Sequence, residues 1–418
     1  MLIVNKSDNL SWTVNIKGSK NAALPIIASC LLIKWEVVLK NVPSIWDVYT
    51  FLDILSQIWV KHEFKDNTLK LDCSNIKEVN FDLEKMKKVR VSILLLAPLL
   101  IRLWKISIPS PGWCNLWKRP IDAHLNWLRD IWYDYNYDGD NIFVSGSLCE
   151  GDMEINAGLW VTSTENLIVA NILRKWKTTI KLAAIEPHVM SLVDFLRRAW
   201  ASIFIRYDHT IVVEWVSALT SNFDFEVISD YIQSGTYMLI WALLSKDYIT
   251  IENARLKDLY SFISKLREAW VRLEDLWWDK VRVYRCDKLK PVSIQTNVFP
   301  WFPTDLQSPF AILMTQAEGN SRIHEVLFEG RLGWLVELEK MWCKVDIINH
   351  HEALISWKTS LEWASVTSWD LRAWAAMVIA WLIASKETKI TNVEYIHRGY
   401  DNLVVNLKSL WASIEEIV

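Results

Sequence analysis

The pattern of apolar and polar positions predicts a chain that alternates helices with short strands. Stretches such as FLRRA (195–199) place apolar residues at helical spacing, and runs rich in Val, Ile and Thr, such as YITIE (248–252), are typical of strands. Two stretches, SILLLAPLLI (92–101) and AAMVIAWLIAS (375–385), have no polar face. Such stretches predict helices that are buried on all sides, so the chain belongs to the α/β class.

The helix-then-strand pattern repeats six times along the chain. In each unit a helix runs into a tryptophan and then into a short β-like run, and these tryptophans are Trp59, Trp132, Trp200, Trp270, Trp342 and Trp411. Successive members lie 73, 68, 70, 72 and 69 residues apart. A second register of turn positions before β-runs has nearly the same period and consists of Trp35, Trp104, Trp176, Asp247, Gly319 and Lys386. Six α/β units of this length predict two domains of three units each.

The six tryptophans stand where a helix ends, a position that favours glycine. The backbone there adopts a positive φ, which costs free energy for any residue with a Cβ atom. An average chain of this length has about 29 glycines. This one has 11, with 26 tryptophans. We interpret most tryptophans as standing at glycine codons, through UGA being read as Trp in a gene whose organism uses it for Gly. A chain that is truly rich in tryptophan is the alternative.

Composition and charge exclude several classes of protein. The net charge of −3 gives no basic surface for nucleic acid, and the longest apolar run (91–101) is too short for a membrane span. The amino terminus lacks the pattern of a signal peptide. Six scattered cysteines without a CxxC pair argue against disulfides and against a zinc site. We therefore expect a cytoplasmic protein without a bound metal or cofactor.

The loop PGWCNLWKRPID (111–122) carries the most distinctive cluster. With glycine in place of Trp113 and Trp117 it comes close to a phosphate-binding P-loop, but Arg119 occupies the position of the Ser or Thr that would bind magnesium. We reject the nucleotide-triphosphatase interpretation for that reason. Cys114 lies near Lys118 and Arg119, and cationic neighbours lower the pKa of a thiol, so a reactive cysteine is predicted.

Other polar residues gather in otherwise apolar surroundings. Lys20 and Asn21 open an apolar helix whose N-terminus would favour an anion, although alone this is an ordinary capped helix. Asp305 lies in a proline-stiffened loop, where a single Asp is usually a helix cap. The remaining residues of this kind are Glu329, Arg331, Asp370, Arg372 and Arg398. Taken singly, each could be one half of a surface salt bridge. Together the cations predict a site for a small polyanion carrying phosphate and carboxylate groups.

The chain resembles the enolpyruvyl transferases over nearly its whole length. The segments that carry the resemblance are KGSKNAALPI, PGWCNLWKRPIDAH, VTSTENL, AAIEPHV, SGTY, FPTDLQ, FEGR, DLRAWAAMVIAW and HRGY. Most tryptophans within them stand at family glycines. The resemblance implies a two-domain inverted α/β barrel, or α/β prism, with one domain at 21–228 and the other at 1–20 plus 229–418. It also implies phosphoenolpyruvate and UDP-N-acetylglucosamine as substrates.

The resemblance assigns roles to individual residues. Cys114 would donate a proton or bond covalently to phosphoenolpyruvate, and Asp305 would accept the sugar hydroxyl proton. The phosphate and carboxylate groups would be held by Lys20, Arg119 and Arg398. Arg331, Asp370 and Arg372 would lie near them. The implied contacts of the UDP-sugar are Asn21, Arg90, Arg119, Pro120, Ile121, Asp122, Ala123, Gly158, Leu159, Trp160, Val161, Asp305 and Leu327.

Three positions depart from the family pattern: His188 and His397 replace common acids, and Gln233 replaces a usual Glu. Other interpretations stay open. A shikimate-pathway enolpyruvyl transferase would share the fold but normally lacks the cysteine loop. A non-catalytic homologue that only binds a nucleotide-sugar would have no need of Lys20 and Cys114. The oligomeric state does not follow from the sequence.

Overall fold

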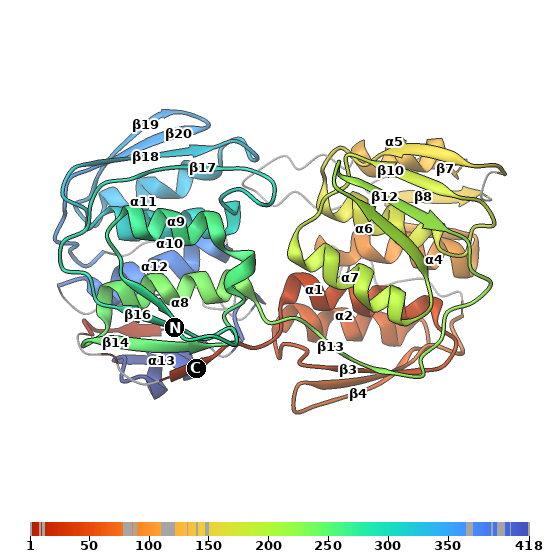
Figure 1. Cartoon of the computed structure of the whole chain (residues 1–418), viewed down its shortest axis with the longest axis horizontal. Coiled ribbons are helices and arrows are strands. Elements are labelled where there is room, and N and C mark those ends of the chain that lie inside the picture. Colours follow the sequence, from red (N-terminus) through yellow and green to blue (C-terminus); the bar gives the residue numbers. More distant parts are fainter. Residues whose placement is uncertain are drawn as a thin grey trace. The chain divides into compact units, whose positions relative to one another are not determined.

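The computed structural model describes most of the chain. The described residues are 2–7, 10, 13–77, 86, 90–109, 122–131, 133–138, 141–146, 150–364, 371–385, 388–390, 398–401 and 403–416. They divide into two compact units, one drawn from 18–228 and the other from 1–17 and 229–418. Figure 1 colours the chain by sequence, so the two units can be followed separately.

In its described residues, the unit within 18–228 has three sheets around apolar helices. Its helices are α1 (Lys20–Ser29), η1 (Cys30–Leu32), α2 (Trp46–Gln57), η2 (Arg90–Leu95), α4 (Leu96–Leu103), α5 (Asp122–Asp130), α6 (Val161–Asn171) and α7 (Pro187–Arg198). Its strands are β3 (Glu36–Lys40), β4 (Lys61–Lys65), β5 (Thr68–Asp72), β6 (Lys105–Pro109), β7 (Tyr133–Asp138), β8 (Asn141–Gly146), β9 (Met153–Asn156), β10 (Thr178–Lys181), β11 (Ser202–Arg206), β12 (Thr210–Glu214) and β13 (Asp224–Glu226). The strand orders are β13-β3-β5-β4, β6-β8-β7 and β11-β12-β10-β9.

The unit formed by 1–17 and 229–418 repeats this plan. Its helices are α8 (Tyr231–Leu244), η3 (Leu256–Asp258), α9 (Tyr260–Glu268), η4 (Thr304–Leu306), α10 (Gln307–Met314), η5 (Arg331–Leu335), α11 (Val336–Glu339), α12 (Leu371–Ile383) and α13 (Leu403–Ser409). Its strands are β1 (Leu2–Val4), β2 (Thr13–Asn15), β14 (Tyr248–Glu252), β15 (Leu273–Asp275), β16 (Val281–Tyr284), β17 (Ser293–Thr296), β18 (Asn320–Glu325), β19 (Lys344–Asn349), β20 (Glu352–Ser356), β21 (Thr388–Ile390) and β22 (Ile414–Glu416). The strand orders are β15-β16-β14-β2, β17-β18-β20-β19 and β21-β1-β22.

The six sheets of the described strands correspond to the six sequence repeats. In the first repeat β4, β5 and β3 pair antiparallel, while β13 joins that sheet in parallel. In the last repeat β21 and β22 both pair antiparallel with β1. In the second unit, α8, α10 and α12 pack against one another (Figure 1), and almost every residue of α12 is buried. The predicted α/β repeat architecture is therefore confirmed. The predicted burial of the 375–385 stretch is confirmed within α12, which is buried up to Leu382, whereas Ser385 beyond the helix is exposed.

Tryptophans occupy helix ends with left-handed backbone, as predicted. Five of the six repeat tryptophans are described, and their φ values are 68° (Trp59), 74° (Trp200), 71° (Trp270), 68° (Trp342) and 73° (Trp411). At Trp200 the chain closes the helix with the paired turn bonds that normally require glycine: Trp200 N–H donates to Arg197 O at 3.0 Å, and Ala201 N–H donates to Leu196 O at 2.9 Å. The sixth, Trp132, lies outside the described residues.

Several buried tryptophans are unusual in another way, because their indole N–H groups lack hydrogen-bond partners among the described residues. The indole N–H groups of Trp127, Trp241, Trp374 and Trp381 are buried without a hydrogen-bond partner in the described part of the chain. A buried indole N–H normally has a partner, because losing its water contact costs free energy. Both observations fit the interpretation that glycine belongs at many of these positions, which stays a prediction.

In the part of the chain that the structure describes, none of the helices combines the length and the apolar character that a membrane span requires.

Candidate active site

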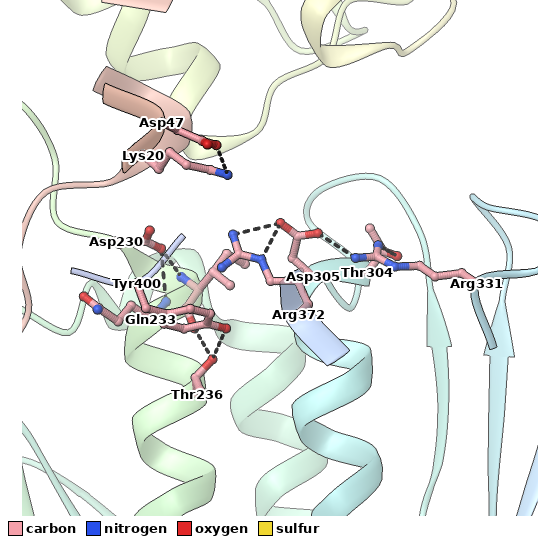
Figure 2. A network of polar contacts seen from close by, with 11 residues as sticks. Lys20, Asp47, Asp230, Gln233, Thr236, Thr304, Asp305, Arg331, Arg372 and Tyr400 are labelled. Atoms are coloured by element: carbon pink, nitrogen blue, oxygen red, sulfur yellow. Dashed lines mark hydrogen bonds and ion pairs between the residues drawn. The ribbon is translucent and has the colours of Figure 1, made fainter. Parts of the chain in front are cut away.

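A carboxylate held between two buried arginines forms the centre of the candidate site. Asp305 lies in the short η4 helix that leads into α10, Arg372 is near the start of α12, and Arg331 opens η5. Asp305 Oδ1 is 3.0 Å from Arg331 Nη2, and Asp305 Oδ2 is 3.1 Å from Arg372 Nη2 (Figure 2). The arginine side chains are only 2% and 4% exposed, whereas that of Asp305 is 28% exposed. The negative charge of Asp305 therefore partly balances two guanidinium groups that are shielded from water.

The surroundings of Arg372 explain how a guanidinium is kept in an apolar helix. Burial by itself lowers the pKa of Arg372, but the negative charges of Asp305 and Asp230, together with a hydrogen bond to the Tyr400 hydroxyl, raise it above its usual value. Its guanidinium lies 5.3 Å from the centre of the Tyr400 ring, and the Tyr400 hydroxyl is hydrogen-bonded to Thr236 on α8 at 3.2 Å. Arg372 thus remains cationic and fixed in position.

Asp230 connects this cluster to the N-terminus of α8. Its Oδ1 accepts hydrogen bonds from the N–H groups of Ile232 (2.9 Å) and Gln233 (3.0 Å), so it caps the helix (Figure 2). Burial raises the pKa of Asp230, while Arg372 opposes that shift. The backbone of Gln233, one of the departures from the family pattern, therefore takes part in this helix cap.

Lys20 lies in the other unit, at the first residue of α1. Its Nζ is 3.2 Å from Asp47 Oδ2 on α2, and the two side chains are 12% and 4% exposed. The N-cap residue Ser19 makes no side-chain cap bond, so the first turn of α1 keeps backbone N–H groups without that partner. A lysine at such a helix N-terminus adds positive charge to the N-terminal end of the helix dipole, which favours an anion.

The remaining described candidates occupy loops and helix starts. Asn21 follows Lys20 on α1, and Ala123 is the second residue of α5. The segment 158–161 turns into α6, with Gly158 and Leu159 at φ values of 65° and 61°. Leu327 N–H donates to Glu325 Oε1 at 3.0 Å. Arg398 is half-buried just after a stretch that is not described, and His188 is buried in the first turn of α7.

Several predicted residues cannot be placed. Outside the described residues lie Cys114, Arg119, Pro120, Ile121, Asp370 and His397. For Arg90, which begins η2, and Asp122, which begins α5, only the backbone is described. In the described part of the chain, no group of three or more His, Cys, Asp or Glu side chains could hold a metal ion.

Two interpretations of single motifs were wrong. Arg331 and Arg372 are not halves of surface salt bridges, because both are buried and both bind the same carboxylate. The side chain of Asp305 likewise binds these arginines instead of capping α10. Sequence reasoning also missed Asp47 and Tyr400, because each meets a partner distant in the chain. It missed Asp230 as well, although an Asp directly before a helix is a local capping signal.

Comparison with known proteins identifies the family. The family model of EPSP synthase (3-phosphoshikimate 1-carboxyvinyltransferase) matches residues 4–407. The chain therefore belongs to this family of enolpyruvyl transferases. Within that class it is 35% identical to a UDP-N-acetylglucosamine 1-carboxyvinyltransferase from Desulfosudis oleivorans, covering 100% of this chain and 99% of that protein. It is 34% identical to the protein of the same name from Finegoldia magna, with 99% and 98% covered.

Solved structures share the fold. The enolpyruvyl transferase NikO from Streptomyces tendae superposes with a TM-score of 0.90 at 21% identity, covering 99% of this chain and 98% of that one. EPSP synthase from Acinetobacter baumannii gives 0.73 at 14% identity, with 99% of each chain covered. At these identities the likeness establishes the architecture alone.

Proposed function

We propose that the chain transfers the enolpyruvyl group of phosphoenolpyruvate to the 3-hydroxyl of UDP-N-acetylglucosamine and releases phosphate. The observation that carries the proposal is the partly exposed Asp305 carboxylate held by two buried arginines, in a chain aligned end to end with 1-carboxyvinyltransferases. A carboxylate can accept a hydroxyl proton, and fixed guanidinium groups stabilise the charge of an anionic substrate.

The reaction requires a base, an acid and a site for anions. The sugar 3-hydroxyl attacks C2 of phosphoenolpyruvate while Asp305 takes its proton, and Cys114 delivers a proton to C3. The resulting tetrahedral intermediate then loses a proton from C3, and phosphate departs with the electron pair of its bond to C2. The phosphate and carboxylate groups are bound by Lys20, Arg119 and Arg398, with Arg331, Arg372 and Asp370 near them. This division of roles separates proton transfer from charge stabilisation.

The UDP-sugar contacts rest on the motifs. The proposed binding residues are Asn21, Arg90, 119–123, 158–161, Asp305 and Leu327. Two of these sites offer backbone groups at turns: 158–160 leads into α6, whose first residue is Val161, and Leu327 follows β18. Backbone groups at such turns can bind a nucleotide-sugar with little loss of conformational freedom, because their positions are already fixed.

The reaction would place the chain at the first committed step of peptidoglycan synthesis, and hence in cell-wall biogenesis, cell shape and cell division. Among the described cysteines, Cys30, Cys73, Cys286 and Cys343 are all free thiols. Free thiols are typical of a reducing compartment, which supports the cytoplasm as the site of the reaction.

A direct assay separates this proposal from the shikimate-pathway alternative. The protein for the assay is the glycine-coded chain, in which glycine replaces every tryptophan that a UGA codon specifies. It should release phosphate from phosphoenolpyruvate when UDP-N-acetylglucosamine is present, and not when shikimate 3-phosphate replaces it. Phosphate release with shikimate 3-phosphate alone would establish the alternative, and binding of the UDP-sugar without any release would establish the non-catalytic homologue.

A further inference from the structure

Glu325 is a fully buried acid that has no part in the reaction proposed above, on which this inference rests. It is the last residue of β18 and is 0% exposed. Its backbone N–H donates to His351 O at 2.8 Å, and its carbonyl oxygen is 2.7 Å from His351 Nδ1. The backbone of Glu325 is therefore fixed at the end of β18, and this fixed backbone limits where its side chain can lie.

Each oxygen of the Glu325 carboxylate binds a different part of the candidate site. Oε1 accepts hydrogen bonds from the N–H groups of Leu327 (3.0 Å) and Phe328 (3.3 Å), which shape the turn after β18. Oε2 accepts a hydrogen bond from the Thr304 hydroxyl at 2.7 Å, across 21 residues of sequence. Because Thr304 directly precedes Asp305 in η4, this second bond fixes the segment that carries the base.

Thr304 extends the connection to an arginine. Its Oγ1 accepts a hydrogen bond from Arg331 Nη1, while Arg331 Nη2 binds Asp305 Oδ1 at 3.0 Å. A hydroxyl has one hydrogen to donate and two lone pairs to accept with. Since its hydrogen goes to Glu325, Thr304 presents a lone pair to Arg331. The direction of the Glu325 bond thus determines how Thr304 can hold the guanidinium.

We propose that Glu325 is a positioning residue, which acts through the Thr304 hydroxyl to hold Arg331 and Asp305 in their reactive arrangement. The chain Glu325–Thr304–Arg331–Asp305 is a set of hydrogen bonds between groups that are mostly shielded from water. Hydrogen bonds of this kind orient the groups that touch substrate, and small misplacements of a base lower turnover strongly. A role limited to the turn at Leu327 would involve Oε1 alone.

Two substitutions separate the two roles. Glu325→Gln can keep Oε1 toward Leu327 and Phe328, but its amide group cannot accept the Thr304 hydrogen and instead donates to Oγ1, in competition with Arg331. Thr304→Val leaves the turn contacts of Glu325 intact and removes the hydroxyl. Thr304→Ser retains the hydroxyl and serves as the conservative rescue. Glu352→Gln, on neighbouring β20 and paired with Arg322, is the matched control.

The experiment measures sugar-dependent phosphate release by the full glycine-coded chain and its variants, with kcat and KM determined separately. For both Glu325→Gln and Thr304→Val we expect kcat to fall about tenfold or more, with KM for the UDP-sugar within about threefold of the parent. Thr304→Ser should recover most of the lost kcat, and Glu352→Gln should match the parent. Near-ultraviolet circular dichroism establishes that each variant is folded.

The outcomes are decisive in each case. Parent-like kcat in Thr304→Val overturns the assignment, and so does a Thr304→Ser variant as slow as Thr304→Val. If Glu325→Gln does not fold, the two Thr304 variants decide alone, because they leave the carboxylate in place. An active parent with unaffected variants overturns this assignment only, whereas an inactive parent overturns the proposed function and this assignment together.

Discussion

Asp305 and Arg372 are 67 residues apart in sequence, yet Asp305 Oδ2 accepts contacts from Arg372 Nε at 3.2 Å and Nη2 at 3.1 Å. The pair joins the short helix η4, which leads into α10, to the start of α12. The helices α10 and α12 pack against each other inside their unit. Because Arg372 is buried and Asp305 is partly exposed, the carboxylate of Asp305 can accept a proton while the guanidinium of Arg372 holds it in position. That arrangement suits a base beside an anionic substrate.

Replacing the proposed base tests this arrangement directly. In Asp305→Asn the amide cannot take up the sugar hydroxyl proton, so we expect kcat to fall by about 100-fold or more. Steady-state phosphate release with varied UDP-N-acetylglucosamine is the measurement, and KM for the sugar should change much less than kcat. A kcat within threefold of the parent would remove Asp305 from the catalytic role.

Fosfomycin should alkylate one cysteine selectively. Burial raises the pKa of the Cys73 thiol to about 12 and raises that of Cys30 well above its usual range, so both remain protonated and unreactive at neutral pH. Cys114, with Lys118 and Arg119 nearby in sequence, should react. Peptide mass spectrometry after treatment at neutral pH should find the adduct on Cys114 alone. Adducts on Cys30 or Cys73 with Cys114 unmodified would contradict the loop assignment.

Glu165 should make the protein less stable as pH rises. Burial, and then the charge of Glu186, raise the pKa of Glu165 well above its ordinary value. The folded chain therefore keeps this proton at pH values where the unfolded chain has released it. The stability that Glu165 contributes is fully present below the pKa that it has in the unfolded chain. As pH rises from there toward the raised pKa of the folded chain, this contribution declines by up to about 1.4 kcal/mol per pH unit.

Glu165→Gln should remove that decline, because glutamine carries no titrating proton. Urea unfolding between pH 5 and pH 8 is the measurement, and the variant should gain stability relative to the parent as pH increases. Glu154→Gln, at an exposed position on β9, is the control and should leave the pH profile unchanged. A parallel profile for parent and Glu165→Gln would show that Glu165 ionises normally.

Glycine at the left-handed helix ends should stabilise the chain. At Trp59, Trp200, Trp270, Trp342 and Trp411 the φ values lie between 68° and 74°, and each change to glycine should contribute about 1 kcal/mol. Thermal unfolding midpoints of the stepwise variants are the measurement. Trp46→Gly, at the first residue of α2, is the control and should bring no gain, since glycine is a poor helix former. Equal gains at Trp46 and at the helix ends would contradict the backbone argument.

The coding DNA tests the origin of the tryptophans. We expect UGA codons at the five described helix-end positions, and glycine there in peptides of the protein purified from its own organism. UGG codons at these positions would establish a chain that is truly rich in tryptophan. In that case the left-handed turns would be strained in the native protein as well.

The sequence by itself determined the features that depend on neighbours along the chain. The helix ends at Trp59 and Trp200, the buried helix at 375–385 and the six-fold period all follow from backbone geometry and apolar spacing within a few residues. The short motifs also singled out Asp305, Arg331 and Arg372, because such groups are unusual in apolar segments.

Only the tertiary structure decided which of these groups meet. Asp305 draws its two partners from η5 and α12, Lys20 pairs with Asp47 on another helix, and Glu325 reaches back to Thr304. Sequence spacing carries no information on such contacts, because they depend on how distant helices and strands pack. Burial then sets their electrostatics: a charge that would be solvated at the surface must find a partner when packing removes water from it.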